Sequence, residues 1–164
     1  MIIKFIVPKD HDHHQPLNPL SGSRVFPPVG LARMAGQAGA LAHVSLLDER
    51  IDPACHELPV DVVVIFVNSY NCTRAYELAK HYKQNGSYVV LTGPLLNHEP
   101  EHACQYADCL FIGAGDELMP VFLEEYVAGR KRRLYRARLD SNAYPTAQWI
   151  VQGDHRSGVL SLAS

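Results

Sequence analysis

The chain has 164 residues, of which 47% are hydrophobic, and carries a formal net charge of −2. It is the size of one domain with a full hydrophobic core, and its charge balance is unlike that of a nucleic-acid-binding protein. It contains neither an apolar run long enough to span a bilayer nor the pattern of a secretory signal, so we expect a cytoplasmic protein with no nucleic-acid or membrane partner.

Short apolar runs alternate with helical patterns along the chain. The runs are rich in Val, Ile, Leu and Phe, which is typical of strands buried on both faces of a parallel sheet; they span residues 1–7, 43–49, 61–68, 87–93 and 108–115. Helical patterns lie between and after them, at residues 29–40, 72–84, 99–106 and 116–128. Because such alternation indicates βαβ units, we predict a doubly wound α/β domain with a five-stranded, mainly parallel sheet and helices on both faces.

The clearest helical pattern is the segment CTRAYELAKHYKQNG. It ends at Gly86, a typical helix stop, and places four apolar residues on one face: Ala75, Leu78, Ala79 and Tyr82.

The four cysteines form no C-x-x-C pair, so we expect reduced thiols rather than a zinc site or disulfides; they are Cys55, Cys72, Cys104 and Cys109. Of these, we expect Cys104 and Cys109 to be packed in the core.

Two regions do not fit the alternation. Residues 8–28 form a loop with five prolines after the first strand, and loops of this length in compact domains are usually functional or disordered. Residues 139–164 carry turn residues and then a short strand-like run, GVLSLAS, that stops at the last residue. We interpret residues 139–164 as a linker and the beginning of a further domain.

The candidate binding residues follow the predicted strands. In an open parallel sheet, ligands bind outside the carboxyl ends of the strands, near the point where the strand order reverses. The loops at this edge hold small, hydroxyl and amide residues, which allow the backbone to approach a ligand and supply hydrogen bonds. The candidates are Asp12, His13, His14, Ser69, Tyr70, Asn71, Thr92, Gly93, Pro94, Gly113, Ala114, Gly115 and Asp116.

Four segments, in this order, resemble one known family. PPVGLARMAG, starting at Pro27, resembles its PPLGLxYLAA signature, with Pro28 near the start of a helix and Gly30 expected to allow close packing. LLDER and DVVVIFVNSYNCTRAYELAKHYKQNGSYVVLTGP follow, and then EHACQYADCLFIGAGDELMPVFLE. Taken together they are similar to the cobalamin-binding domains at the N-terminus of cobalamin-dependent radical S-adenosylmethionine (SAM) enzymes.

The resemblance implies a flavodoxin-like (Rossmann-like) cobalamin-binding domain over residues 1–138. The nucleotide tail of cobalamin would lie in the crevice among the first, third and fourth strands. Residues 139–164 would then lead into a radical SAM domain in cis, which would hold a 4Fe–4S cluster and S-adenosylmethionine. This chain would bind cobalamin without catalysis of its own, and the parent enzyme would be a radical SAM methyltransferase or a related enzyme.

The loop after the first strand leaves the cobalt ligand open. Asp12 and His14 match the beginning of the Asp-x-His-x-x-Gly fingerprint, in which the imidazole binds cobalt, but Leu17 stands in the place of the glycine. His14 is therefore the candidate metal ligand, and a solvated loop is the alternative.

Other motifs have structural alternatives. HEPEH, starting at His98, matches a zinc-protease pattern, but Pro100 belongs in a first helical turn and makes His98 a cap rather than a ligand. The basic run at residues 129–138 can attract phosphates, or it can be the cationic end of a helix followed by a solvated edge strand. Helix N-caps are the alternative role for some candidates, namely Ser69 or Asn71 for one helix and Asp116 for the last.

Two other functions remain open on the sequence. One is a docking module that has kept the fold and lost the ligand. The other is a flavin- or nucleotide-binding flavodoxin-like domain, which the loop after the first strand disfavours because it lacks a phosphate cradle rich in Ser and Thr.

Overall fold

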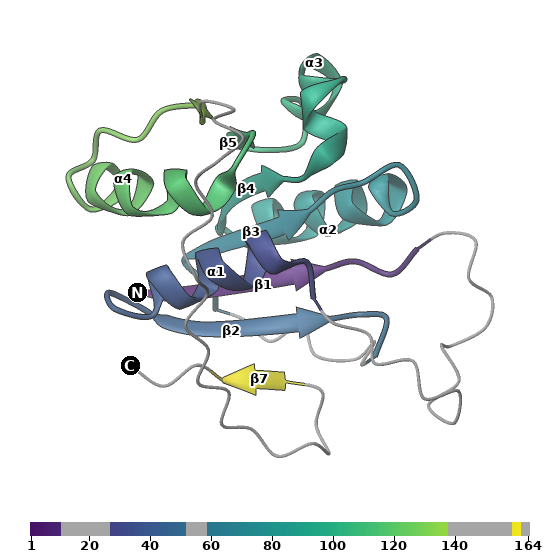
Figure 1. Cartoon of the computed structure of the whole chain (residues 1–164). Helices are drawn as coiled ribbons and strands as arrows, with labels where there is room; N and C mark the ends of the chain where they lie inside the picture. The colour runs from purple at the N-terminus through teal and green to yellow at the C-terminus, as the bar shows by residue number, and fades with distance from the viewer. Residues whose placement is uncertain (11–26, 52–58, 138–158, 162–164) are drawn as a thin grey trace.

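The computed structural model describes residues 1–10, 27–51, 59–137 and 159–161. One sheet crosses the middle of the molecule, with helices on both of its faces (Figure 1). The elements in chain order are β1 (Ile2–Val7), α1 (Val29–Ala38), β2 (His43–Asp48), β3 (Val62–Phe66), α2 (Cys72–Gln84), β4 (Tyr88–Thr92), the 3₁₀ helix η2 (Pro94–Asn97), α3 (Pro100–Ala103), β5 (Cys109–Ile112), α4 (Gly115–Val127), β6 (Leu134–Arg136) and β7 (Val159–Ser161).

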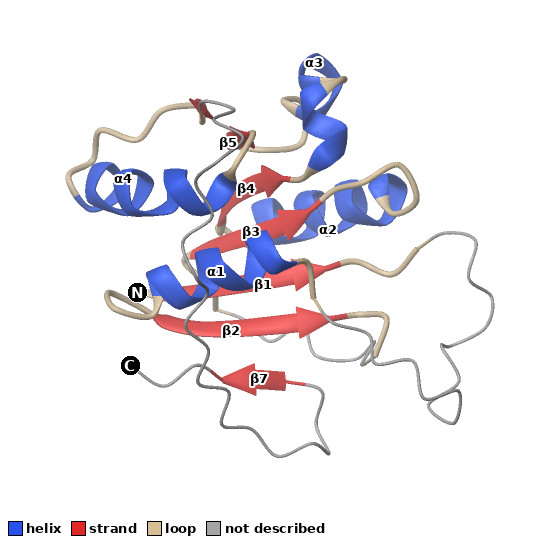
Figure 2. Cartoon of the chain, in the orientation of Figure 1, coloured by secondary structure: helices blue, strands red, loops and turns tan. Residues whose placement is uncertain are grey.

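The strand order is that of a doubly wound sheet. Within the described residues seven strands pair in the order β6-β5-β4-β3-β1-β2-β7, and all neighbours are parallel except β2 and β7 (Figure 2). The order reverses between β1 and β3, as in flavodoxin-like folds. The predicted α/β class is therefore confirmed.

The predicted count of five strands is too low. The additional strands are β6, within the basic run, and β7, within the tail. Each has only three residues, which is too short for hydrophobic periodicity to reveal a partner in the sheet. The sequence indicated strand character in both segments but did not predict that they join this sheet. The predicted domain boundary after residue 138 lies outside the described residues.

Strands β1, β3, β4 and β5 are buried on both faces, and their successive side chains belong to two different core layers. Phe5, Val64 and Phe111 face α1 and α4, whereas Ile6, Ile65 and Ile112 face α2 and η2. The predicted face of α2 is confirmed, because its four apolar residues are at most 3% exposed. This double burial explains why the strands are continuous apolar runs.

Two predicted packing roles are wrong. Cys104 is exposed, because it caps the short helix α3, whereas Cys109 on β5 is buried as predicted. Gly30 is also exposed, and a Cβ there would meet no described atom within 4 Å, so it makes no close packing contact with the described residues. Among the described residues no helix combines the length and apolar character that crossing a membrane requires.

Candidate ligand-binding edge of the sheet

The reversal of strand order places the candidate site at the carboxyl ends of β1 and β3. After β1 the chain crosses to α1 on one face, and after β3 it crosses to α2 on the other. The two connections diverge there, which leaves a crevice at this position in folds of this kind. The loops after β4 and β5 border the same edge, so the sheet topology brings the predicted binding loops to one edge.

The loop after β3 is closed by two asparagine side chains. Asn68 Oδ1 accepts hydrogen bonds from the N–H groups of Tyr70 (2.8 Å) and Asn71 (2.9 Å). In return, Asn71 Oδ1 accepts one from the Asn68 N–H (2.8 Å). Asn71 is 1% exposed, yet its Nδ2 has no hydrogen-bond partner among the residues that the structure describes. The loop therefore presents a fixed, buried amide donor next to the exposed ring of Tyr70.

The proposed side-chain caps of α2 are not present. Asn71 stands at the N-cap position, but its side chain makes no cap hydrogen bond because it is committed to Asn68. Ser69 lies earlier in the same loop. Only the backbone of Asn71 serves the helix, since its carbonyl accepts the N–H of Ala75 at 2.9 Å.

Gly93 allows the ends of β3 and β4 to meet. Its φ is +132° and its ψ is 172°, a conformation that only glycine adopts readily. A Cβ at this position would lie 2.2 Å from the carbonyl oxygen of Val67. The Val67 N–H donates to the Thr92 carbonyl at 2.7 Å, so the two segments remain paired beyond the last residue of β3. Pro94 follows on the surface.

Gly115 brings the beginning of α4 against α1. A Cβ at Gly115 would lie 2.8 Å from Met34 Sδ and 3.0 Å from Thr92 Oγ1, so the buried Thr92 hydroxyl faces this contact. Gly113 and Ala114, which precede it, are half-buried. The glycine-rich candidates therefore bring β4, β5 and α1 together.

Asp116 is not the N-cap of α4. Ala114 occupies that position, and Asp116 lies in the first turn, where a carboxylate is favourable to the helix dipole. Its Oδ2 pairs with Arg33 Nε at 3.2 Å, and both side chains are nearly buried. Asp116 thus ties the first turn of α4 to α1.

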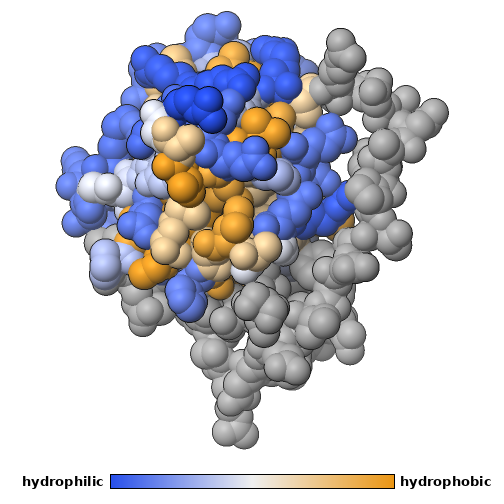
Figure 3. Space-filling model, turned by 90° about the vertical axis from the view of Figure 1, so that its left-hand side faces the viewer, coloured by the Kyte–Doolittle hydropathy of each residue, from blue (hydrophilic) through white to orange (hydrophobic). Residues whose placement is uncertain are grey.

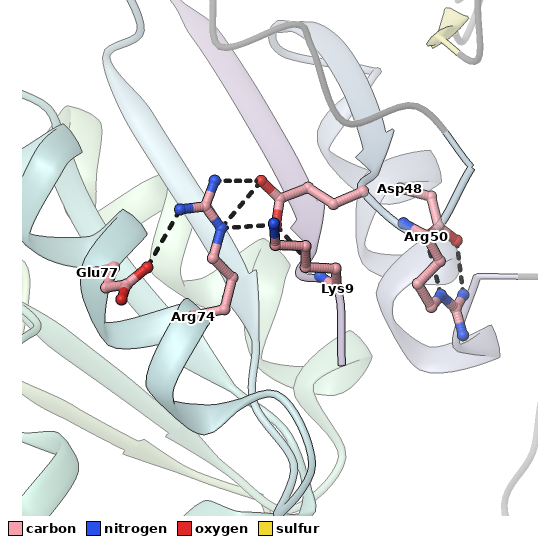
Figure 4. A network of polar contacts seen from close by, with 6 residues as sticks. Lys9, Asp48, Arg50, Arg74 and Glu77 are labelled. Atoms are coloured by element: carbon pink, nitrogen blue, oxygen red, sulfur yellow. Dashed lines mark hydrogen bonds and ion pairs between the residues drawn. The ribbon is translucent and has the colours of Figure 1, made fainter. Parts of the chain in front are cut away.

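A charged network at the end of β2 was missed by the sequence analysis (Figure 4). Glu49 accepts hydrogen bonds from the Lys9 N–H and from Arg74, whose pKa is raised mainly by this contact. Asp48, beside it, binds Arg50 through Nε and Nη2 at 2.8 and 2.6 Å, which raises the pKa of Arg50. The available signal was the charged triplet in LLDER, directly after a buried strand.

The structure describes only part of the sequence motifs that contain metal-binding residue types. Asp12, His13 and His14 lie outside the described residues. His98 precedes α3, whose first residue is Pro100, so HEPEH does not place two histidines on one helix. In the described part of the chain no three His, Cys, Asp or Glu side chains gather as metal ligands do.

The first half of the basic run, residues 129–133, lies at the opposite, amino-terminal edge of the sheet, before β6 begins. Lys131 Nζ is 4.7 Å from the ring centres of both Tyr88 and Tyr126, and Arg132 pairs with Glu125. Figure 3 faces this edge and shows apolar residues in the middle, bordered by hydrophilic ones. The other end of the run reaches the candidate edge, because the Ala137 N–H donates to the Ile112 carbonyl at 2.9 Å and a Cβ at Gly113 would lie 3.2 Å from the Ala137 carbonyl oxygen.

Comparison with known proteins relates the chain to part of an enzyme. No family model matches it. Over 114 residues, or 69% of the chain, it is 32% identical to the bacteriochlorophyllide d C-8(2)-methyltransferase of Chlorobaculum tepidum, of which it spans only 24%. A solved structure, the N-terminal domain of a hypothetical protein of Thermotoga maritima, is 18% identical with a TM-score of 0.39, covering 51% of this chain and 78% of that one.

Proposed function

We propose that this chain binds cobalamin at the carboxyl-terminal edge of its sheet, as the N-terminal domain of a cobalamin-dependent radical SAM methyltransferase. The observation that carries the proposal is the 32% identity to an enzyme named as a methyltransferase. The motifs of the chain independently resemble a family in which bound cobalamin relays methyl groups. The 4Fe–4S cluster and S-adenosylmethionine belong to a further domain of the parent enzyme, so this chain alone has no catalytic activity.

The described residues fit the nucleotide tail of cobalamin. This tail carries phosphate and ribose oxygens, which accept hydrogen bonds, and a benzimidazole ring, which is apolar and flat. The Asn71 Nδ2 is a buried donor with no partner in the described part of the chain, and leaving such a donor unpaired costs about 1–3 kcal/mol. An acceptor on the ligand would remove this cost. The exposed ring of Tyr70, in the same loop, offers a surface on which the benzimidazole can stack.

The other candidates divide into two roles in this proposal. Ser69 and Tyr70 are contact residues on the loop after β3. Thr92 and Gly115 are packing residues, because each lies against the other beneath the edge. His14 remains the proposed cobalt ligand, together with Asp12 and His13 as its neighbours.

Retention of a coloured ligand tests the proposal directly. The 164-residue chain is mixed with hydroxocobalamin, desalted, and its visible spectrum recorded; we expect a retained red chromophore. Asn71→Asp keeps the oxygen that accepts the Asn68 N–H but removes the Nδ2 donor, so we expect its Kd to rise roughly tenfold or more. Lys83→Gln removes an ion pair with Asp108 at the other end of α2 and serves as the control.

Each alternative function predicts a different result. Complete loss of colour from the wild-type chain would contradict cobalamin binding and favour the docking module. Retention of flavin mononucleotide in place of hydroxocobalamin would favour the flavin-binding alternative. A spectral change of the bound cobalamin on His14→Ala is expected if its imidazole binds the cobalt; an unchanged spectrum excludes this role.

A further inference from the structure

One buried carboxylate connects three elements at the candidate site. Glu49 follows β2, and its N–H donates to the Val7 carbonyl at 2.9 Å, which extends the pairing with β1. Its carboxylate accepts the Lys9 N–H at 3.2 Å and the Arg74 Nη2 at 2.7 Å, with Arg74 Nε at 3.1 Å. The Glu49 side chain is only 1% exposed. Glu49 thus joins the end of β2, the chain leaving β1, and the first turn of α2.

These contacts extend across the point where the strand order reverses. Lys9 belongs to the connection that leaves β1 toward α1, whereas Arg74 belongs to the helix that follows β3. These are the two connections that diverge at the reversal and border the crevice. The Glu49 carboxylate therefore links the two segments, through the Lys9 N–H on one side and Arg74 on the other. Glu77, one turn further along α2, holds Arg74 from the other side at 3.2 Å.

A buried ion pair is an inefficient way to stabilise a fold. Removing the Glu49 charge from water costs much of what its attraction to the partly exposed Arg74 returns, and apolar residues of similar size often stabilise a protein equally well. What such a pair does provide is defined geometry, because Arg74 is held at two nitrogens by one carboxylate. The fixed geometry of the Glu49–Arg74 contact is therefore the property for which we propose a function.

We propose that Glu49 and Arg74 are positioning residues for the nucleotide tail of cobalamin. They hold Lys9 and the beginning of α2 at the spacing that the tail requires, without contact to the ligand. This inference rests on the proposed cobalamin binding. It assigns to these residues a role in affinity that is separate from their contribution to folding.

Two ligands that differ only in the tail distinguish positioning from general stability. Hydroxocobalamin carries the nucleotide tail, whereas cobinamide has the same corrin ring without it. We expect Glu49→Gln and Arg74→Gln each to raise the Kd of hydroxocobalamin about tenfold or more, and to leave the Kd of cobinamide within about twofold. Because the two residues act as a unit, the double variant is expected to match the weaker-binding single variant. Lys83→Gln, which removes an ion pair elsewhere on α2, should leave both values unchanged.

The outcomes separate this inference from the function on which it rests. Equal weakening of both ligands would show a general structural effect and overturn the positioning role, as would unchanged affinities. A wild-type chain that retains no hydroxocobalamin would instead refute the proposed function itself. Binding is measured at a temperature where thermal unfolding shows every variant folded. Arg74 is the more exposed partner, so Arg74→Gln carries the test if Glu49→Gln does not fold.

Discussion

Replacement of Gly93 by alanine is expected to be among the most damaging single-methyl additions to this fold. The backbone at Gly93, with φ +132° and ψ 172°, costs a residue other than glycine about 1–3 kcal/mol. The new Cβ would also lie 2.2 Å from the Val67 carbonyl oxygen, which is backbone and cannot rotate away. Relieving such an overlap typically costs a further ~1–3 kcal/mol. We therefore expect Gly93→Ala to lower the free energy of unfolding by about 2–6 kcal/mol.

Two other glycines separate the contributions to this loss. Gly86 has a φ of +85°, but a methyl group added there would meet no described atom within 4 Å, so Gly86→Ala bears only the conformational cost, about 1–2 kcal/mol. Gly30, in the first turn of α1, has neither constraint among the described residues, and Gly30→Ala should stabilise by up to about 1 kcal/mol.

Urea unfolding followed by far-ultraviolet circular dichroism measures all three variants. If the slopes agree with wild type, midpoints convert directly to free energies. The expected order of stability is Gly30→Ala, wild type, Gly86→Ala, Gly93→Ala. The reasoning is refuted if Gly93→Ala is no less stable than Gly86→Ala, because the close approach of Val67 would then carry no cost.

Two further predictions concern titrating groups. At about pH 8 an alkylating reagent should modify the exposed Cys104 in the native protein but reach Cys109 only after unfolding, because burial of Cys109 raises its pKa to about 12; peptide mass spectrometry measures both sites. Raising the pH from about 10 to about 12 should lower the free energy of unfolding, measured by urea midpoints. Burial raises the pKa of Tyr76 and Tyr135 from the ordinary value of 10.0 to about 12, so the unfolded chain loses these protons first. A midpoint that is constant over this range would contradict the burial of both hydroxyls.

The sequence by itself determined the class of fold and the loops that border the candidate site. Strands buried on both faces are apolar at nearly every position, so they are visible as near-continuous runs; the buried Lys4 in β1 is an exception. Helix α2 is visible because one face alone is apolar. The alternation of these patterns requires parallel strands with crossover helices. Small and amide residues after each strand then indicated the binding edge without any knowledge of strand order.

Only the tertiary structure decided which residues meet at that edge. Glu49 and Arg74 are 25 positions apart and belong to different elements, so their pairing has no local signal. The same applies to the pair between Arg33 and Asp116. The sequence suggested Asp116 as a helix cap instead. The need for glycine at Gly93 arises from the backbone of a neighbouring strand. Periodicity reports the environment of each segment separately, whereas these contacts depend on the register and order in which the segments assemble.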